Sequence, residues 1–149
     1  MKAVVQRVTS ASLTCDNKLI STIGNGLVIY FGVGQGDSEK QAEYLAKKVC
    51  ALRIFSDENG KMNLSCKDLG YEILCVSQFT LLADLAHGNR PSFTLAEAPA
   101  RANELYEYFC SCLEQNGVLT KKGVFGGDMT INQVNQGPVT IVYDNVIVK

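Results

Sequence analysis

Alternating apolar and polar positions predict that the chain begins with strands. Residues 1–14 alternate in this way, and Asp16-Asn17-Lys18 then supplies turn residues before a second short strand, Leu19–Ile23. Leu27–Val33 is apolar throughout, which is typical of a central strand buried on both faces. We expect these three strands to form a meander.

Two later segments have the apolar spacing of helices. Ser38 followed three residues later by Gln41 has the form of a capping box, and Pro99 suits a first helical turn. The apolar positions expected on the buried face of the first helix are Ala42, Leu45, Val49 and Leu52. Those of the second helix, which Gly117 ends, are Ala102, Leu105, Tyr106, Phe109, Cys112 and Leu113.

The remaining apolar runs predict more strands. Tyr71–Leu82 is the strongest of them, and a polar loop follows at Asp84–Thr94. Asp128–Val134 and Val139–Tyr143 predict two strands on either side of Gly137-Pro138. The order of elements favours a mixed α+β fold, in which a largely antiparallel sheet or partly open β-barrel has two main helices packed outside.

Composition narrows the class of protein. The 149 residues suit one domain spanning 1–149, with 46% hydrophobic and 19% charged residues. No apolar run is long enough for a membrane span, and the first residues lack the form of a signal peptide, so we expect a cytoplasmic protein without membrane contact. A formal charge of −1 argues against broad electrostatic coating of nucleic acid and leaves local RNA contact open.

The cysteines and the single histidine do not form a known catalytic or metal-binding pattern. The six cysteines include no C-x-x-C pair, and one histidine cannot complete a Cys/His zinc set. We therefore expect reduced, mostly buried thiols, no metal and no cofactor. His87 lies in a Gly-rich loop and is expected to be exposed to solvent.

Two short stretches are candidates for a site. Ser77-Gln78-Phe79-Thr80 places hydroxyls, an amide and main-chain N–H groups at the end of the most apolar strand, either to bind a developing oxyanion or to satisfy a frayed strand end. Gly137-Pro138 either starts a strand with a trans peptide bond or holds an unusual backbone, and X–Pro is the common site of cis bonds.

Six stretches in order along the chain resemble the D-aminoacyl-tRNA deacylase family, also called D-tyrosyl-tRNA deacylase. They are Met1–Val8, Leu52–Asn63, Ser77–Leu81, Gly88–Phe93, Phe125–Met129 and Asn135–Thr140. The resemblance implies a homodimer that hydrolyses the ester joining a D-amino acid to the 3′ adenosine of tRNA. It implies that the Gly137-Pro138 bond is cis and enters the partner subunit's active site, where main-chain carbonyls bind the α-ammonium and the backbone rejects L-amino acids. Glycyl-tRNA, which has no side chain to reject, is expected to be accepted as well.

The same resemblance implies roles for individual residues. Ser77, Gln78, Phe79 and Thr80 are expected around the scissile ester, with the N–H groups of Phe79 or Thr80 as oxyanion donors. Phe125 and Met129 are expected to border the terminal adenosine, the alternative being core packing. Arg7 is expected to brace the Gly-Pro loop through its fork of donors.

No base is evident beside Thr80, and an unassisted hydroxyl is a poor nucleophile. We therefore expect water to attack with help from the ribose 2′-OH. Two alternative interpretations remain open. One is a non-catalytic RNA-binding module, and the other is a related deacylase with a trans Gly-Pro bond and relaxed chirality.

Overall fold

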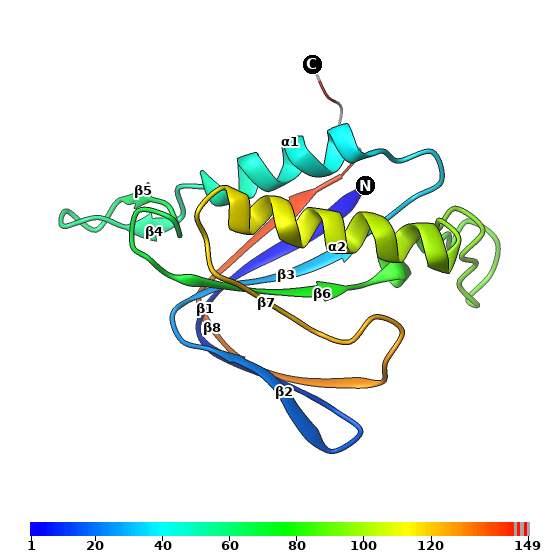
Figure 1. Cartoon of the computed structure of the whole chain (residues 1–149), viewed down its shortest axis with the longest axis horizontal. Coiled ribbons are helices and arrows are strands. Elements are labelled where there is room, and N and C mark those ends of the chain that lie inside the picture. Colours follow the sequence, from blue (N-terminus) through cyan, green and yellow to red (C-terminus); the bar gives the residue numbers. More distant parts are fainter. Residues whose placement is uncertain (145, 147, 149) are drawn as a thin grey trace.

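Two helices cover one face of a twisted sheet, and further strands fold beneath its other face (Figure 1). The computed structural model describes residues 1–144, 146 and 148. This arrangement confirms the predicted α+β fold, a barrel-like sheet with two main helices packed outside. Within these residues, no helix is both long and apolar enough to cross a membrane.

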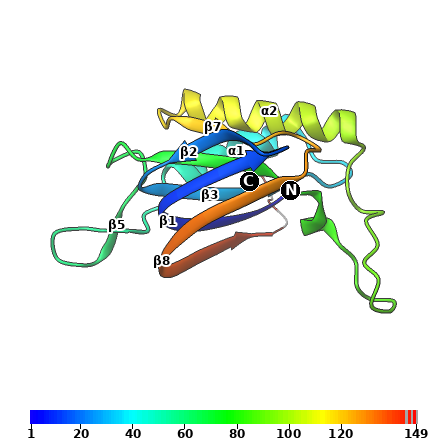
Figure 2. The ribbon, with the colours of Figure 1, turned by 90° about the horizontal axis from the view of Figure 1, so that it is seen from below.

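Strand β1 (Lys2–Cys15) organises the sheet because it pairs with three others. Strand β2 (Lys18–Ile23) pairs with its second half, and β3 (Gly26–Gly32) pairs with its first half. The predicted meander is therefore wrong, since β3 pairs with β1 and not with β2. With 14 residues, β1 is long enough to serve two partners in succession, and Figures 1 and 2 show it turning from the upper sheet into the lower layer.

Strand β6 (Glu72–Ser77) runs parallel to β3, and β7 (Thr120–Lys122) runs parallel to β6. The predicted strand through Leu82 is too long, because Phe79–Leu82 forms a 3₁₀ helix, η1. The cause is the end of β3 at Gly32, which leaves no strand for residues after Ser77 to pair with. The backbone turns back on itself instead.

The two helices begin where the sequence predicts. Helix α1 (Glu39–Cys50) follows Ser38, whose backbone N–H donates to the Gln41 side chain at 2.7 Å. Helix α2 (Pro99–Gln115) starts at Pro99, and Gly117 lies just beyond its end with φ of 90°. Leu52 is an error of the prediction, because α1 ends two residues before it. It still packs, half-buried, against the core.

Two cores lie on opposite faces of the sheet. Between the sheet and the helices, the rings of Phe31 and Phe109 stack with centroids 4.2 Å apart. Between the two layers of strands, the core includes Leu13, Val28 and Leu74. All six cysteines are buried free thiols, as predicted.

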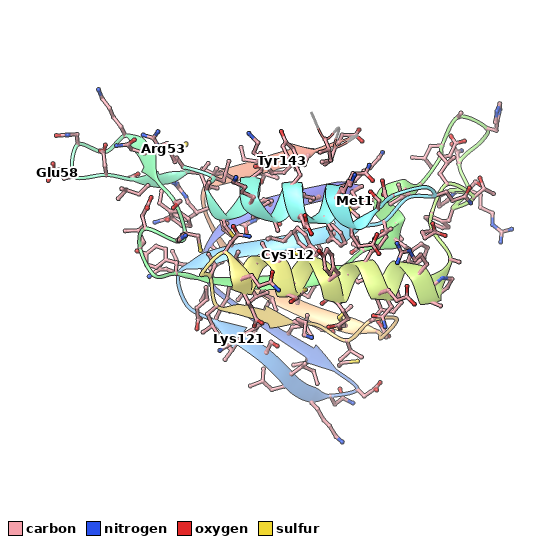
Figure 3. All side chains as sticks on the ribbon, turned by 45° about the horizontal axis from the view of Figure 1, so that its top comes forward. Met1, Arg53, Glu58, Cys112, Lys121 and Tyr143 are labelled. Atoms are coloured by element: carbon pink, nitrogen blue, oxygen red, sulfur yellow. The ribbon has the colours of Figure 1, made fainter. Side chains whose placement is uncertain are left out.

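The barrel nearly closes where β2 approaches β7. Lys121 Nζ donates to the Thr22 carbonyl at 2.7 Å, and Ser21 Oγ donates to the Lys122 carbonyl at 2.6 Å (Figure 3 labels Lys121). These contacts involve side chains and do not form a ladder. At the other side of the molecule, β4 (Phe55–Ser56) and β5 (Met62–Leu64) form a small hairpin with Glu58 in its projecting turn (Figure 3).

The two strands predicted near the C-terminus are one long strand, β8 (Met129–Tyr143), which pairs with β1. Its register breaks in the middle, because Asn135 faces Val8 whereas Thr140 faces Gln6. Four residues of β8, 136–139, therefore lie opposite a single residue of β1 and bulge. The Gly137-Pro138 peptide bond within this bulge is cis, as the resemblance implied, and both residues are exposed.

Candidate functional site

A cavity of about 710 Å³ opens at the end of β6. It lies where the ends of β3 and β6 meet the loop before β8 and the beginning of α2. Its lining is largely apolar and comprises Phe31, Val33, Val76, Ser77, Gln78, Phe79, Phe93, Ala96, Glu97, Ala98, Pro99, Ala102, Phe125, Gly126, Gly127, Asp128, Met129 and Ile131. Five of the nine residues predicted for the site, Ser77, Gln78, Phe79, Phe125 and Met129, are in this lining.

The parallel pairing of β3 with β6 positions the polar part of the cavity. Ser77 faces Phe31 in the ladder, and the next backbone N–H, that of Gln78, donates to the Phe31 carbonyl at 2.8 Å. Phe79 is 55% exposed, and its ring contacts that of Phe93 edge to face with centroids 4.9 Å apart. Phe79 and Thr80 begin η1, and the first N–H groups of a helix have no acceptor within that helix.

Thr80 stands beside the cavity and is not among its lining residues. Its side chain is exposed and accepts a hydrogen bond from Gln78 Nε2. In the described part of the chain, no hydrogen bond joins Thr80 to a carboxylate or an imidazole. His87, the one imidazole of the sequence, lies on an exposed loop.

Phe125 and Met129 lie between cavity and core. The Phe125 ring is 6.1 Å from that of Tyr106, and Met129 Sδ accepts the Val124 N–H at 3.3 Å. Tyr106 donates through its hydroxyl to the Cys75 carbonyl at 2.8 Å, and burial raises the pKa of this phenol. Tyr106 is therefore uncharged where its ring lies beside Phe125. The positions of Phe125 and Met129 fit both predicted roles, bordering the terminal adenosine and packing in the core.

Sequence reasoning missed the two carboxylates in the lining, Glu97 and Asp128. Glu97 Oε1 accepts the Ala98 N–H at 2.8 Å and is carried to the cavity by the start of α2. Nothing in the sequence around it signals this position, because only the packing of α2 brings it there. Asp128 and Phe93, by contrast, belong to stretches that carry the family resemblance.

Gly137, Pro138 and Arg7 lie outside this cavity. Arg7 is buried, and it donates from Nε to the Gln136 carbonyl at 3.2 Å and from a terminal nitrogen to the Ile54 carbonyl at 2.7 Å. Arg7 faces Leu27 across the ladder, four residues before the cavity residue Phe31 on β3. At the rise of a strand, that separation is about 13 Å.

Comparisons with known proteins agree across the chain. Residues 4–144 match the family model described as D-Tyr-tRNA(Tyr) deacylase. The D-aminoacyl-tRNA deacylases of Koribacter versatilis and Staphylococcus carnosus are each 51% identical over 145 residues, covering 97% of this chain and 97% and 96% of their own lengths.

Two solved structures share the fold. A c-Myc DNA unwinding element binding protein has a TM-score of 0.92 at 43% identity, covering 97% of this chain and 99% of its own. A probable eukaryotic D-amino acid tRNA deacylase has a TM-score of 0.79 at 17% identity, covering 95% of this chain and 97% of its own.

Proposed function

The chain belongs to the D-aminoacyl-tRNA deacylase family and is thus a hydrolase acting on aminoacyl-tRNA, and from this premise we propose that it selects D-aminoacyl esters with the Gly137-Pro138 segment. The single observation that carries the proposal is the separation of two features within one protomer. The cavity offers an ester-sized site, whereas the exposed Gly137-Pro138 bulge lies elsewhere on the same chain. A second protomer brings the two together.

Selection in this scheme acts on the backbone of the substrate. Main-chain carbonyls of the segment accept hydrogen bonds from the α-ammonium group, and the two enantiomers then direct their side chains differently. The side chain of a D-amino acid points to open space, and that of an L-amino acid strikes the backbone. Glycyl-tRNA lacks a side chain to strike, so it is a substrate of the same site.

Hydrolysis proceeds by attack of water on the ester carbonyl carbon. The oxygen–carbon bond from water forms, the bond to the ribose 3′-oxygen breaks, and the proton released by water reaches that 3′-oxygen with help from the 2′-OH. The N–H group of Phe79 or Thr80 stabilises the oxyanion, which is where preorganised donors contribute most to catalysis. The products are the free D-amino acid and tRNA.

Deacylation of D-, L- and glycyl-tRNA by the purified protein tests this function. We expect turnover of the D-aminoacyl and glycyl substrates and little of the L-aminoacyl one. Binding of tRNA without turnover of any substrate would favour the RNA-binding module. Comparable turnover of D- and L-aminoacyl-tRNA would indicate relaxed chirality, although the trans Gly-Pro bond of that alternative is wrong because the Gly137-Pro138 bond is cis.

Mixed dimers test whether the segment serves the partner. Gly137→Ala damages the segment, because an added Cβ would lie 3.0 Å from an Arg7 nitrogen and 2.9 Å from Val139 Cγ2 at a φ of +118°. Phe79→Pro removes a cavity N–H donor. Co-refolding the two variants places one intact cavity beside one intact segment in each heterodimer, so about a quarter of wild-type activity should return with C2 symmetry. No recovery would show that each protomer uses its own segment.

A further inference from the structure

The side chains of Tyr30, Gln6 and Gln133 form a hydrogen-bonded chain across three strands. Tyr30 on β3 donates through its hydroxyl to Gln133 Oε1 at 2.9 Å, and Gln133 Nε2 donates to Gln6 Oε1 at 2.8 Å. A primary amide has two donors on nitrogen, and the second donates to Asn135 Oδ1 at 2.6 Å. Gln133 therefore uses its oxygen and both of its N–H donors at once.

This network joins parts of the chain that the strand ladders do not join. Gln133 faces Ala11 in the ladder, whereas Gln6 lies beyond the two register breaks of the β1–β8 pair. Tyr30 faces Val4 on the other side of β1, and burial raises the pKa of its hydroxyl, which therefore remains a donor. Gln133 thus connects the first half of β8, which lies in the lower layer of strands, to the upper sheet.

The network ends at both borders of the Gly137-Pro138 bulge. Asn135 is the last residue paired before the bulge and Thr140 is the first one after it, and Gln6 Nε2 reaches the Thr140 hydroxyl at 3.4 Å. Arg7 holds the Gln136 carbonyl from the side of the helices. Alternate residues of a strand point to opposite faces, so the side chains of Gln6 and Arg7 contact the bulge and its border from opposite faces of the sheet. The bulge is therefore fastened from both faces of the sheet.

We propose that Gln133 is a positioning residue that holds the borders of the Gly137-Pro138 bulge through Asn135 and Gln6, and thereby sets how strictly the enzyme rejects L-aminoacyl-tRNA. This inference rests on the proposed role of the bulge in selection. Gln133 lies outside the cavity lining, so its loss affects discrimination more than turnover of the D-substrate.

The test compares deacylation of D- and L-aminoacyl-tRNA by wild type, Gln133→Leu, Tyr30→Phe and the double variant. We expect Gln133→Leu to raise the L-to-D ratio of kcat/KM by about two- to ten-fold, the equivalent of one hydrogen bond, with D-activity nearly kept. Tyr30→Phe should act in the same direction more weakly, and the double variant should be no worse than Gln133→Leu. Gln115→Leu, an equal change on an exposed face of α2, is the matched control.

An unchanged ratio in Gln133→Leu, or equal losses on both substrates, would overturn the inference. Should that variant fail to fold, Tyr30→Phe carries the test alone, because it removes one hydroxyl and keeps the ring. Gly137→Ala measured alongside separates the two proposals. If it changes the ratio while Gln133→Leu does not, only the positioning role is wrong. If it leaves the ratio unchanged, the selecting role of the bulge is wrong and the inference falls with it.

Discussion

The guanidinium of Arg7 donates from Nε to the main-chain carbonyl of Gln136 at 3.2 Å, directly before Gly137. A second donor of the same group reaches the Ile54 carbonyl at 2.7 Å. One side chain thus links the bulge of β8 to the segment after α1. The geometry depends on a planar fork of donors, which an ammonium group does not have.

Arg7→Lys should therefore loosen the bulge and leave one buried carbonyl without its donor. We expect a loss of about 1–3 kcal/mol in unfolding free energy, together with weaker rejection of L-aminoacyl-tRNA. Chemical denaturation and deacylation of both enantiomers measure these effects. Arg53→Lys, at an exposed arginine that contacts Asn63, is the control and should change neither. A wild-type enantiomer ratio in Arg7→Lys would contradict the bracing role.

Two substitutions at Phe79 separate its ring from its backbone donor. Phe79→Pro removes the N–H at the first position of η1, where proline is tolerated, and the preceding Gln78, with φ of −144° and ψ of 82°, lies outside the helical region that a following proline disfavours. Phe79→Ala removes the ring and keeps the donor. We expect kcat to fall about 10²–10³-fold more in the proline variant than in the alanine variant. Equal kcat in single-turnover assays of the two variants would exclude this donor from the oxyanion site.

Thr80→Ala should retain substantial activity, because no hydrogen bond in the described part of the chain links this hydroxyl to a base. We expect the 2′-OH of the substrate to contribute more to the rate of hydrolysis than the Thr80 hydroxyl. D-aminoacyl-tRNA ending in 2′-deoxyadenosine should be hydrolysed poorly by the wild type, with its binding measured separately by competition. Full activity on the deoxy substrate would remove the 2′-OH from the mechanism.

Two neighbouring glycines provide a matched test of the fold. An added Cβ at Gly26 would lie 1.9 Å from the Glu72 carbonyl oxygen, whereas one at Gly24 would meet nothing within 4 Å. Gly26→Ala should cost about 3 kcal/mol or prevent folding, since the parallel β3–β6 pairing must separate. Gly24→Ala should remain near wild type in thermal denaturation. Similar melting temperatures for the two variants would contradict this close approach.

The buried thiols predict how stability depends on pH. Burial raises the pKa of Cys66 from its ordinary value of 9.0 to about 12 and that of Cys50 to about 11. The folded state therefore keeps protons that the unfolded chain releases, so this contribution is complete below pH 9 and is lost as the pH rises toward 11 and 12. Denaturation at pH 8, 9 and 10 should show falling stability, and Cys50→Ala/Cys66→Ala should show a shallower fall. An equal slope in the double variant would assign the effect to other groups.

Local patterns predicted the elements of this fold more accurately than their pairing. Ser38, Pro99 and the spacing of apolar residues located both helices because capping and amphipathicity are local properties. The pairing of β3 with β1 depends on the length of β1 and on the parallel pairing of β6 with β3. Neither property can be predicted from a short stretch of sequence. Likewise, the end of β6 at Ser77 follows from the end of β3 and not from its own sequence.

The residues of the candidate site likewise include some that the sequence identified and some that it did not. Ser77 through Phe79 could be identified because polar residues follow an apolar strand, and the family resemblance pointed to Phe125 and Met129. Glu97 and the link through Gln133 could not, because each depends on residues from another element meeting in space. The physical cause is tertiary packing, which sequence spacing does not encode directly.

Because β1 forms ladders with β2, β3 and β8 together, inserting or deleting one residue within it would shift three registers at once. Natural length variation among relatives should therefore avoid residues 2–15. It should accumulate instead in the turn around Glu58 and in the exposed loop near His87, where an extra residue disturbs no neighbour in the sheet.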